Sequence, residues 1–205
     1  MKRSKGESIM EKLIKRALDI AHLFDVPRGE MTCEPYGTGN INDTFCLTVR
    51  PWTGAARRYI LQRVNRYVFP DPQSMMGNIQ RVTHYLRGVI AREGGDPARE
   101  TLTLVRAMDG RPWITDASGD LWRVYLFIEG TVSTDRPETP ERFAAAGEAF
   151  GRFQRQLGGF DASTLYPTLP NFHNTPARLQ QLTNAIGADA AGRRAEVGAE
   201  IGFCM

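Results

Sequence analysis

The sequence predicts an α+β fold in which one helix packs on an antiparallel sheet and further helices follow. Short apolar segments alternate with glycine-containing turns between residues 31 and 128, a pattern typical of antiparallel strands. One longer segment, residues 71–92, repeats its apolar residues at helical spacing. After Gly130 only helical patterns follow, so we expect a sheet-containing lobe over residues 1–130 and the start of a helical part over 131–205.

The first helix is predicted near the N-terminus. Ser8 and Glu11 have the three-residue spacing of a capping box. Apolar residues then recur at helical spacing: Ile9, Met10, Leu13, Ile14, Ala17, Leu18 and Ala21. This pattern predicts a surface helix whose apolar stripe packs on the domain. A membrane-surface role is the less favoured alternative, suggested by the basic polar face.

Six strands are predicted in two groups of three. The first group lies near residues 31–36, 45–49 and 58–64, and its tight connections indicate an antiparallel meander. The second group is predicted at 101–106, 111–115 and 121–128. Between the groups, Asp71 and Pro72 are typical of a helix start, with aspartate as N-cap and proline in the first turn.

The second half of the chain is predicted to be helical. A helix begins at Thr139-Pro140, and its inward-facing residues are expected to be Phe143, Ala146, Gly147, Phe150, Phe153 and Leu157. Thr175-Pro176 begins another helix, and residues 190–201 are compatible with one more.

The composition excludes several classes of protein. The chain has 26 Lys and Arg residues against 23 Asp and Glu, and its arginines form no basic stripe, so we expect no nucleic-acid partner. Three cysteines without C-x-x-C spacing indicate reduced thiols in a cytoplasmic protein rather than a zinc site or disulfide scaffold. The apolar runs are too short to span a membrane, so no membrane partner is expected. Nothing here indicates an oligomeric state.

The segment Gly37-Thr38-Gly39-Asn40-Ile41-Asn42-Asp43-Thr44 joins the first two predicted strands. Its two glycines permit sharp turning and close approach of a ligand to the backbone. Successive N–H groups in such a turn can form an anion site suited to phosphate. The alternative is an ordinary hairpin turn, for which Gly-Asn is a common signal.

Several segments in order resemble a known family of kinases. They are the glycine segment, Tyr59-Ile-Leu-Gln-Arg-Val-Asn65, Phe69 to Pro72, Asn78-Ile79, and Leu169-Pro-Asn-Phe-His-Asn-Thr-Pro176. Together they resemble the N-acetylhexosamine 1-kinase group of the aminoglycoside phosphotransferase and choline kinase superfamily, over residues 36–178. The resemblance implies a protein-kinase-like N-lobe with the beginning of a helical C-lobe, and an ATP-dependent sugar 1-kinase acting on a small-molecule sugar.

The resemblance also implies site residues. The backbone of Thr38, Gly39, Asn40 and Ile41 would cover the ATP phosphates. Where such folds place a phosphate-binding lysine, this strand has Gln62 and Arg63, and because strand side chains alternate, only one of them can face the nucleotide. The segment at Glu129 would form the hinge whose backbone pairs with adenine.

Further residues are assigned by the resemblance to the sugar or to local structure. Asn42 and Asp43 would approach the substrate or cap their own turn, and these alternatives stay open. His173 and Arg178 would contact the sugar hydroxyls, although a loop histidine bonded to a neighbouring carbonyl is the plainer interpretation. Arg81, His84 and Arg87 are expected to face solvent. They lie on the predicted helix 71–92, which also lacks the central glutamate usual in kinases.

The catalytic elements of this superfamily are missing from the sequence. No His-x-Asp loop and no second acidic motif for Mg²⁺ occur between Gly130 and Met205. We therefore expect an N-terminal fragment of a kinase that uses ATP and Mg²⁺, with the catalytic residues and metal ligands further on, and this chain alone is expected to transfer no phosphate. The alternative is a non-catalytic nucleotide-binding or interaction module derived from the same fold.

Overall fold

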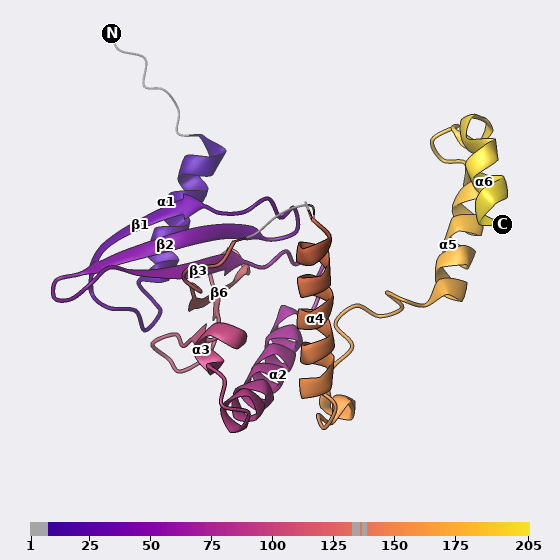
Figure 1. Ribbon diagram of the computed structural model, residues 1–205. Coiled ribbons are helices and arrows are strands. Elements are labelled where there is room, and N and C mark those ends of the chain that lie inside the picture. The colour runs from indigo at the N-terminus through magenta and orange to yellow at the C-terminus, as the bar shows by residue number, and fades with distance from the viewer. Residues whose placement is uncertain (1–7, 133–135, 137–138) are drawn as a thin grey trace, which may run out of the picture. The chain divides into compact units, whose positions relative to one another are not determined.

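The computed structural model describes residues 8–132, 136 and 139–205 (Figure 1). The chain forms two compact units, Met1–Thr168 and Leu169–Met205. The boundary predicted near Gly130 stays a prediction. Among the described residues, none of the helices combines the length and the apolar character needed to cross a membrane.

The first unit contains a six-stranded sheet. Its strands are β1 Gly29–Pro35, β2 Asp43–Pro51, β3 Arg57–Arg63, β4 Leu104–Val105, β5 Ile114–Thr115 and β6 Leu121–Leu126. The order is β1-β2-β3-β6-β4, with β5 also paired to β6, and every pairing is antiparallel. The prediction of a mixed fold with an antiparallel sheet is therefore confirmed. The strands predicted at 101–106 and 111–115 shorten to two residues each, and the short helix α3 Pro97–Glu100 precedes the first of them.

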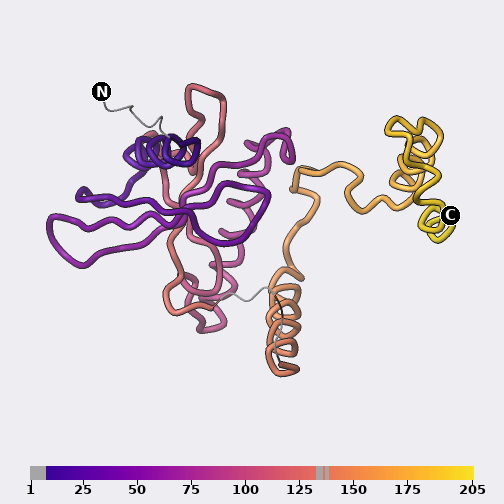
Figure 2. The backbone as a smooth tube through the Cα atoms, turned by 90° about the horizontal axis from the view of Figure 1, so that it is seen from above, coloured from indigo at the N-terminus to yellow at the C-terminus, as the bar shows by residue number. Residues whose placement is uncertain are grey.

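Helix α1 Ile9–Ala21 covers one face of this sheet (Figure 2). The predicted capping box forms, because Ser8 Oγ accepts from the Glu11 N–H and the Glu11 carboxylate accepts from the Ser8 N–H. The end of the helix and the segment after it pack on apolar side chains of the sheet: Ala17, Ile20, Ala21 and Phe24 against Phe45, Leu47, Leu61, Trp122 and Val124. Ile9 and Met10 are exposed, so the predicted stripe is packed only in its later turns.

Helix α2 Pro72–Arg92 lies on the other side of the sheet. Asp71 is its N-cap, as predicted, and the Asp71 carboxylate accepts from the Ser74 N–H at 3.0 Å. Met75 and Met76 of the helix are buried against Val64 and Leu121 at the ends of the strands. The sheet thus has two different faces, one packed on α1 and one partly covered by α2.

Helix α4 Pro140–Gln156 begins at the N-cap Thr139, as predicted. Its last turn contacts α2, since Arg155 forms an ion pair with Glu93 and Gln156 donates to the same carboxylate at 3.0 Å. The prediction that its aromatic residues face inward is wrong among the described residues: Phe143, Phe150 and Phe153 are 69%, 68% and 44% exposed. The helix contacts α2 through its C-terminal turn, and the described residues of the first unit leave its aromatic side chains exposed.

The second unit contains α5 Thr175–Ala188 and α6 Gly198–Cys204, with a 3₁₀ turn Arg194–Val197 before α6. Asn174 caps α5, because its side-chain oxygen accepts from the Ala177 N–H at 3.1 Å. The helix predicted at Thr175 is confirmed. The stretch predicted over 190–201 is divided between the 3₁₀ turn and the start of α6.

Candidate functional site

Side chains on the α2 side of the sheet form regular rows across three strands. The register aligns Thr44, Gln62 and Arg123 in one row, and Cys46, Ile60 and Tyr125 in the next. We call these six residues the α2 face. The alternate residues of the same strands, including Leu61, Arg63, Trp122 and Val124, form the α1 face because strand side chains alternate between the two sides.

The first row of the α2 face is held by hydrogen bonds. Gln62 Nε2 donates to Thr44 Oγ1 at 2.8 Å. Gln62 Oε1 accepts from Arg123 Nε at 3.0 Å and from Arg123 Nη2 at 2.7 Å. Arg123 Nη1 lies 3.8 Å from the sulfur of Met76 on α2. The guanidinium is therefore fixed in place by an amide oxygen and a thioether.

Arg123 has no carboxylate partner among the described residues, although it is half-buried. Burial lowers its pKa, and the one ionisable neighbour that opposes this effect is Tyr125. A desolvated charge without an opposite charge is costly to the folded state. An anion bound beside Arg123 would offset this cost, and a guanidinium is well suited to phosphate oxygens.

Arg63, one residue along β3, has the opposite surroundings. Its guanidinium contacts the Asp43 carboxylate at 2.6 Å and that of Asp120 at 3.2 Å. Burial lowers the Arg63 pKa, but these two carboxylates outweigh it, so the pKa is raised. Asp120 also accepts from Arg16 of α1 at 2.8 Å. The structure thus places Gln62 on the α2 face and Arg63 within an ion-pair network on the α1 face.

A second acid extends this network on the α1 face. Asp116 forms an ion pair with Arg16 and accepts from the Trp122 indole N–H at 2.6 Å. Partial burial raises the Asp116 pKa, but hydrogen bonds from Trp122 and Arg16 prevail and lower it. The charges on this face are therefore already compensated within the protein.

The glycine loop closes the β1–β2 hairpin beside the first row of the α2 face. The Tyr36 N–H donates to the Thr44 carbonyl at 2.9 Å, and the loop beyond it is exposed. Gly37 has φ +80°, whereas Gly39 lies outside the left-handed region and a Cβ there would meet no atom within 4 Å. Thus Gly37 provides the turn, and Thr38 to Ile41 lie on an open surface.

A cavity of about 420 Å³ adjoins this loop and collects four of the predicted site residues: Asn40, Ile41, Asp43 and Arg63. Its ionised groups are paired with one another, since Arg63 contacts Asp43 and Asp120, and Arg66 lies 3.9 Å from Asp120. The Asn42 side-chain oxygen accepts from the Asn65 N–H at 3.0 Å. Asn42 and Asp43 therefore bond to residues outside their own turn.

The segment after β6 contains the predicted hinge residue. Glu129 forms an ion pair with Arg58, whose hydrogen bond lowers the Glu129 pKa. The Glu129 carbonyl accepts from Arg99 at 2.9 Å, so this backbone oxygen is already engaged. The Arg58 guanidinium lies 4.0 Å over the ring of Phe127, and that ring meets Tyr36 edge-on at 5.5 Å. The aromatic rings of Tyr36 and Phe127 therefore contact each other beside the α2 face.

His173 and Arg178 belong to the second unit. The His173 ring lies edge-on to Phe172 with 4.7 Å between centroids, and Arg178 donates to Gln181 at 3.0 Å. Their assignment to the sugar stays a prediction.

Arg123 was not identified by sequence reasoning. Its signal was present, since an arginine interrupts the apolar strand Leu-Trp-Arg-Val-Tyr-Leu of β6. Within the described part of the chain, no group of His, Cys, Asp or Glu side chains is arranged to hold a metal ion. A comparison with models of known protein families finds none that matches this chain. The resemblance to N-acetylhexosamine 1-kinases therefore stays a prediction.

Proposed function

We propose that the α2 face and the adjoining glycine loop bind ATP, and that the protein is an ATP-dependent small-molecule phosphotransferase of the sugar 1-kinase type. One observation carries the nucleotide proposal. Arg123 is half-buried, fixed by Gln62, lacks a carboxylate partner among the described residues and lies in the row beside the glycine loop. Its position on β6 gives the nucleotide phosphates a cation, although β3 lacks the usual lysine.

The residues around Arg123 suit the remaining parts of ATP. Cys46 and Tyr125 are half-buried in the row beside it, and together they offer a largely apolar surface to the base. The exposed backbone of residues 38–41 would contact the phosphates. The sugar acceptor and Mg²⁺ are assigned by the sequence resemblance alone.

A non-catalytic nucleotide-binding module is the second candidate. The same observation supports it, because a bound nucleotide would offset the charge of Arg123 without any transfer of phosphate. The two candidates share the nucleotide site and differ in whether phosphate is transferred, so ATP binding tests what they have in common.

The experiment is calorimetric titration of the purified chain with ATP and with adenosine. We expect ATP to bind at least about tenfold more tightly, roughly 1.4 kcal/mol, because the phosphates meet Arg123. Arg123→Gln should remove this preference while leaving adenosine binding unchanged. Arg57→Gln, which removes an exposed charge at the start of β3, is the control and should keep the preference. Equal affinities of the wild-type chain for ATP and adenosine would refute the proposal.

A further inference from the structure

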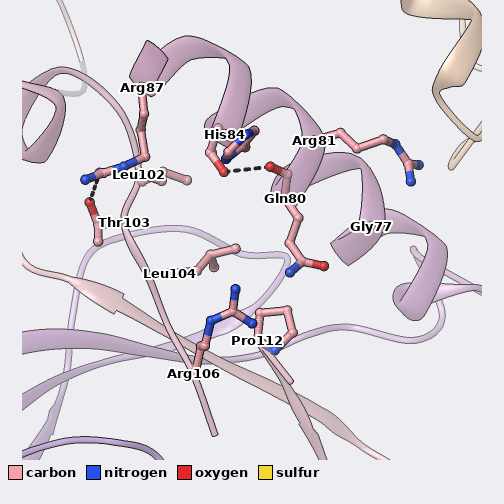
Figure 3. A pocket seen from close by; sticks show the side chains of 11 residues that line it. Gly77, Gln80, Arg81, His84, Arg87, Leu102, Thr103, Leu104, Arg106 and Pro112 are labelled. Carbon is pink, nitrogen blue, oxygen red and sulfur yellow. Dashed lines mark hydrogen bonds between the residues drawn. The ribbon is translucent and has the colours of Figure 1, made fainter. Parts of the chain in front are cut away.

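A second cavity, of about 540 Å³, lies between α2 and the segment containing β4 (Figure 3). Its walls include Gln80, His84 and Arg87 from the helix, and Thr103, Leu104, Arg106 and Pro112 from the opposite segment. None of the lining residues belongs to the α2 face or to the glycine loop. The volume is within the usual range for small-molecule sites, roughly 300–1,000 Å³.

The polar lining of this cavity is basic. Arg87 donates through Nη1 to Thr103 Oγ1 at 2.7 Å and to the Pro97 carbonyl at 3.2 Å. Arg106 donates through Nη1 to the Gly110 carbonyl at 2.7 Å. The lining contains no carboxylate, and neither arginine pairs with one in the described ranges. All of these hydrogen bonds run through Nη1, so among the described residues the Nε and Nη2 donors of each guanidinium remain for another partner.

Figure 3 shows how these groups are directed. Arg106 and Gln80 approach each other from opposite walls, and Arg87 lies to one side with Thr103. Arg81 extends away from the others, so it lies at the rim. Arg87 was predicted to face solvent, but its side chain is half-buried and joins the helix to the opposite wall through Thr103.

The remaining lining is apolar. Leu104 packs against the core cluster of Met75 and Met76, and Pro112 is buried. A ligand matched to this cavity needs an anionic group for the arginines and an apolar body for these side chains. Planar guanidinium donors recognise phosphate in particular, since two N–H groups can meet two oxygens of one phosphate.

We propose that this pocket binds a small organic phosphate, with Arg106 and Gln80 holding the phosphate and Leu104 and Pro112 contacting the apolar body. This site is separate from the proposed nucleotide site and does not depend on it. His84 and the half-buried Arg87 add further hydrogen-bonding groups on the helix wall.

The test uses phenyl phosphate as the probe, with phenol and inorganic phosphate as its separate halves. Calorimetric titration of the full chain should show phenyl phosphate binding more tightly than either half. Arg106→Gln should weaken phenyl phosphate at least about tenfold, as loss of one charge-assisted contact predicts. Arg106→Lys keeps the charge and should lose less, which separates a binding defect from misfolding.

Two variants serve as controls. Arg92→Gln removes one positive charge from the same helix outside the pocket, and Arg123→Gln alters only the proposed nucleotide site. Both should leave phenyl phosphate affinity unchanged. The proposal is overturned if phenol binds as tightly as phenyl phosphate, if Arg92→Gln weakens binding as much as Arg106→Gln, or if the folded Arg106→Gln variant binds normally.

Discussion

Arg63 and Arg123 lie on the adjacent strands β3 and β6, one register row apart, and their guanidinium groups point to opposite faces of the sheet. Arg63 contacts two carboxylates on the α1 face. Arg123 contacts a neutral amide and a thioether on the α2 face. The two arginines therefore lie close together in the sheet, but only Arg63 has carboxylate partners among the described residues.

This difference separates structural from ligand-binding charge. On the α1 face, Asp120 and Asp43 neutralise Arg63, and Trp122 and Phe45 stack nearby within the core. That face is complete without a ligand. On the α2 face the desolvated cation Arg123 has no carboxylate partner among the described residues, which is the situation that a bound anion relieves.

Removal of a large side chain from the α1 face should have the largest effect. Trp122 is fully buried, stacks on Phe45 and donates to Asp116. Trp122→Ala should lower the free energy of unfolding by about 3–5 kcal/mol, measured by urea denaturation. Trp52, which is 79% exposed, provides the control, and Trp52→Ala should change stability by no more than roughly 0.5 kcal/mol. Similar losses in both variants would show that Trp122 is not part of a packed core.

The ion-pair network of the α1 face should contribute a smaller amount. Asp120→Asn removes the charge that Arg16 and Arg63 share. Because Asp116 and Asp43 remain as partners, we expect a loss of about 1–3 kcal/mol in unfolding free energy and no change in ATP affinity. Weaker ATP binding in a folded Asp120→Asn variant would contradict the structural assignment of this face.

Substitution in the glycine loop separates phosphate binding from a plain hairpin turn. Gly39→Val should raise the Kd for ATP at least about tenfold, because bulk there obstructs the backbone, while the melting temperature stays unchanged. Gly37→Val is the matched control: its φ of +80° is unfavourable for valine, so it should lower stability. An unchanged ATP Kd for a well-folded Gly39→Val variant would remove the phosphate-loop assignment.

The smallest effect is expected for the alkylation of two cysteines, Cys33 and Cys46, which lie on opposite faces of the sheet. Burial raises the pKa of Cys33 to about 12, so iodoacetamide should leave it unmodified in the native chain. Cys46 is half-buried on the α2 face, and its slow alkylation should become slower with ATP. Exposed Cys204 is the internal reference, followed in the same digest by mass spectrometry. Protection of Cys204 to the same extent would show that ATP does not act at the α2 face.

Local sequence signals were sufficient for most of the elements. Asp71 with Pro72, Ser8 with Glu11, and Thr139 with Pro140 each mark a helix start through contacts within three residues, and all three caps form. The antiparallel meander followed likewise from short turns between strands.

The candidate site depended on contacts that the local sequence does not contain. Alternation along β3 implied that Gln62 and Arg63 face opposite sides, but the choice between them required the pairing with β6, some 60 residues away. Arg123 stands out only in the folded sheet, where Gln62 lies opposite it and none of the described carboxylates pairs with it. The orientation of Phe143 and Phe150 was predicted from periodicity, which defines a stripe and not what covers it.

The most direct test of the contrast is to measure ATP affinity and thermal stability for Arg63→Gln and Arg123→Gln in parallel. At position 123, glutamine can still donate an N–H to Gln62 Oε1 but carries no charge. We expect Arg123→Gln to raise the ATP Kd at least about tenfold with little change in melting temperature. Arg63→Gln should lower the melting temperature, by roughly 2–4 °C for each kcal/mol of unfolding free energy that is lost. It should leave the ATP Kd unchanged. Equal ATP affinities for the two variants, or a loss of ATP binding confined to Arg63→Gln, would contradict it.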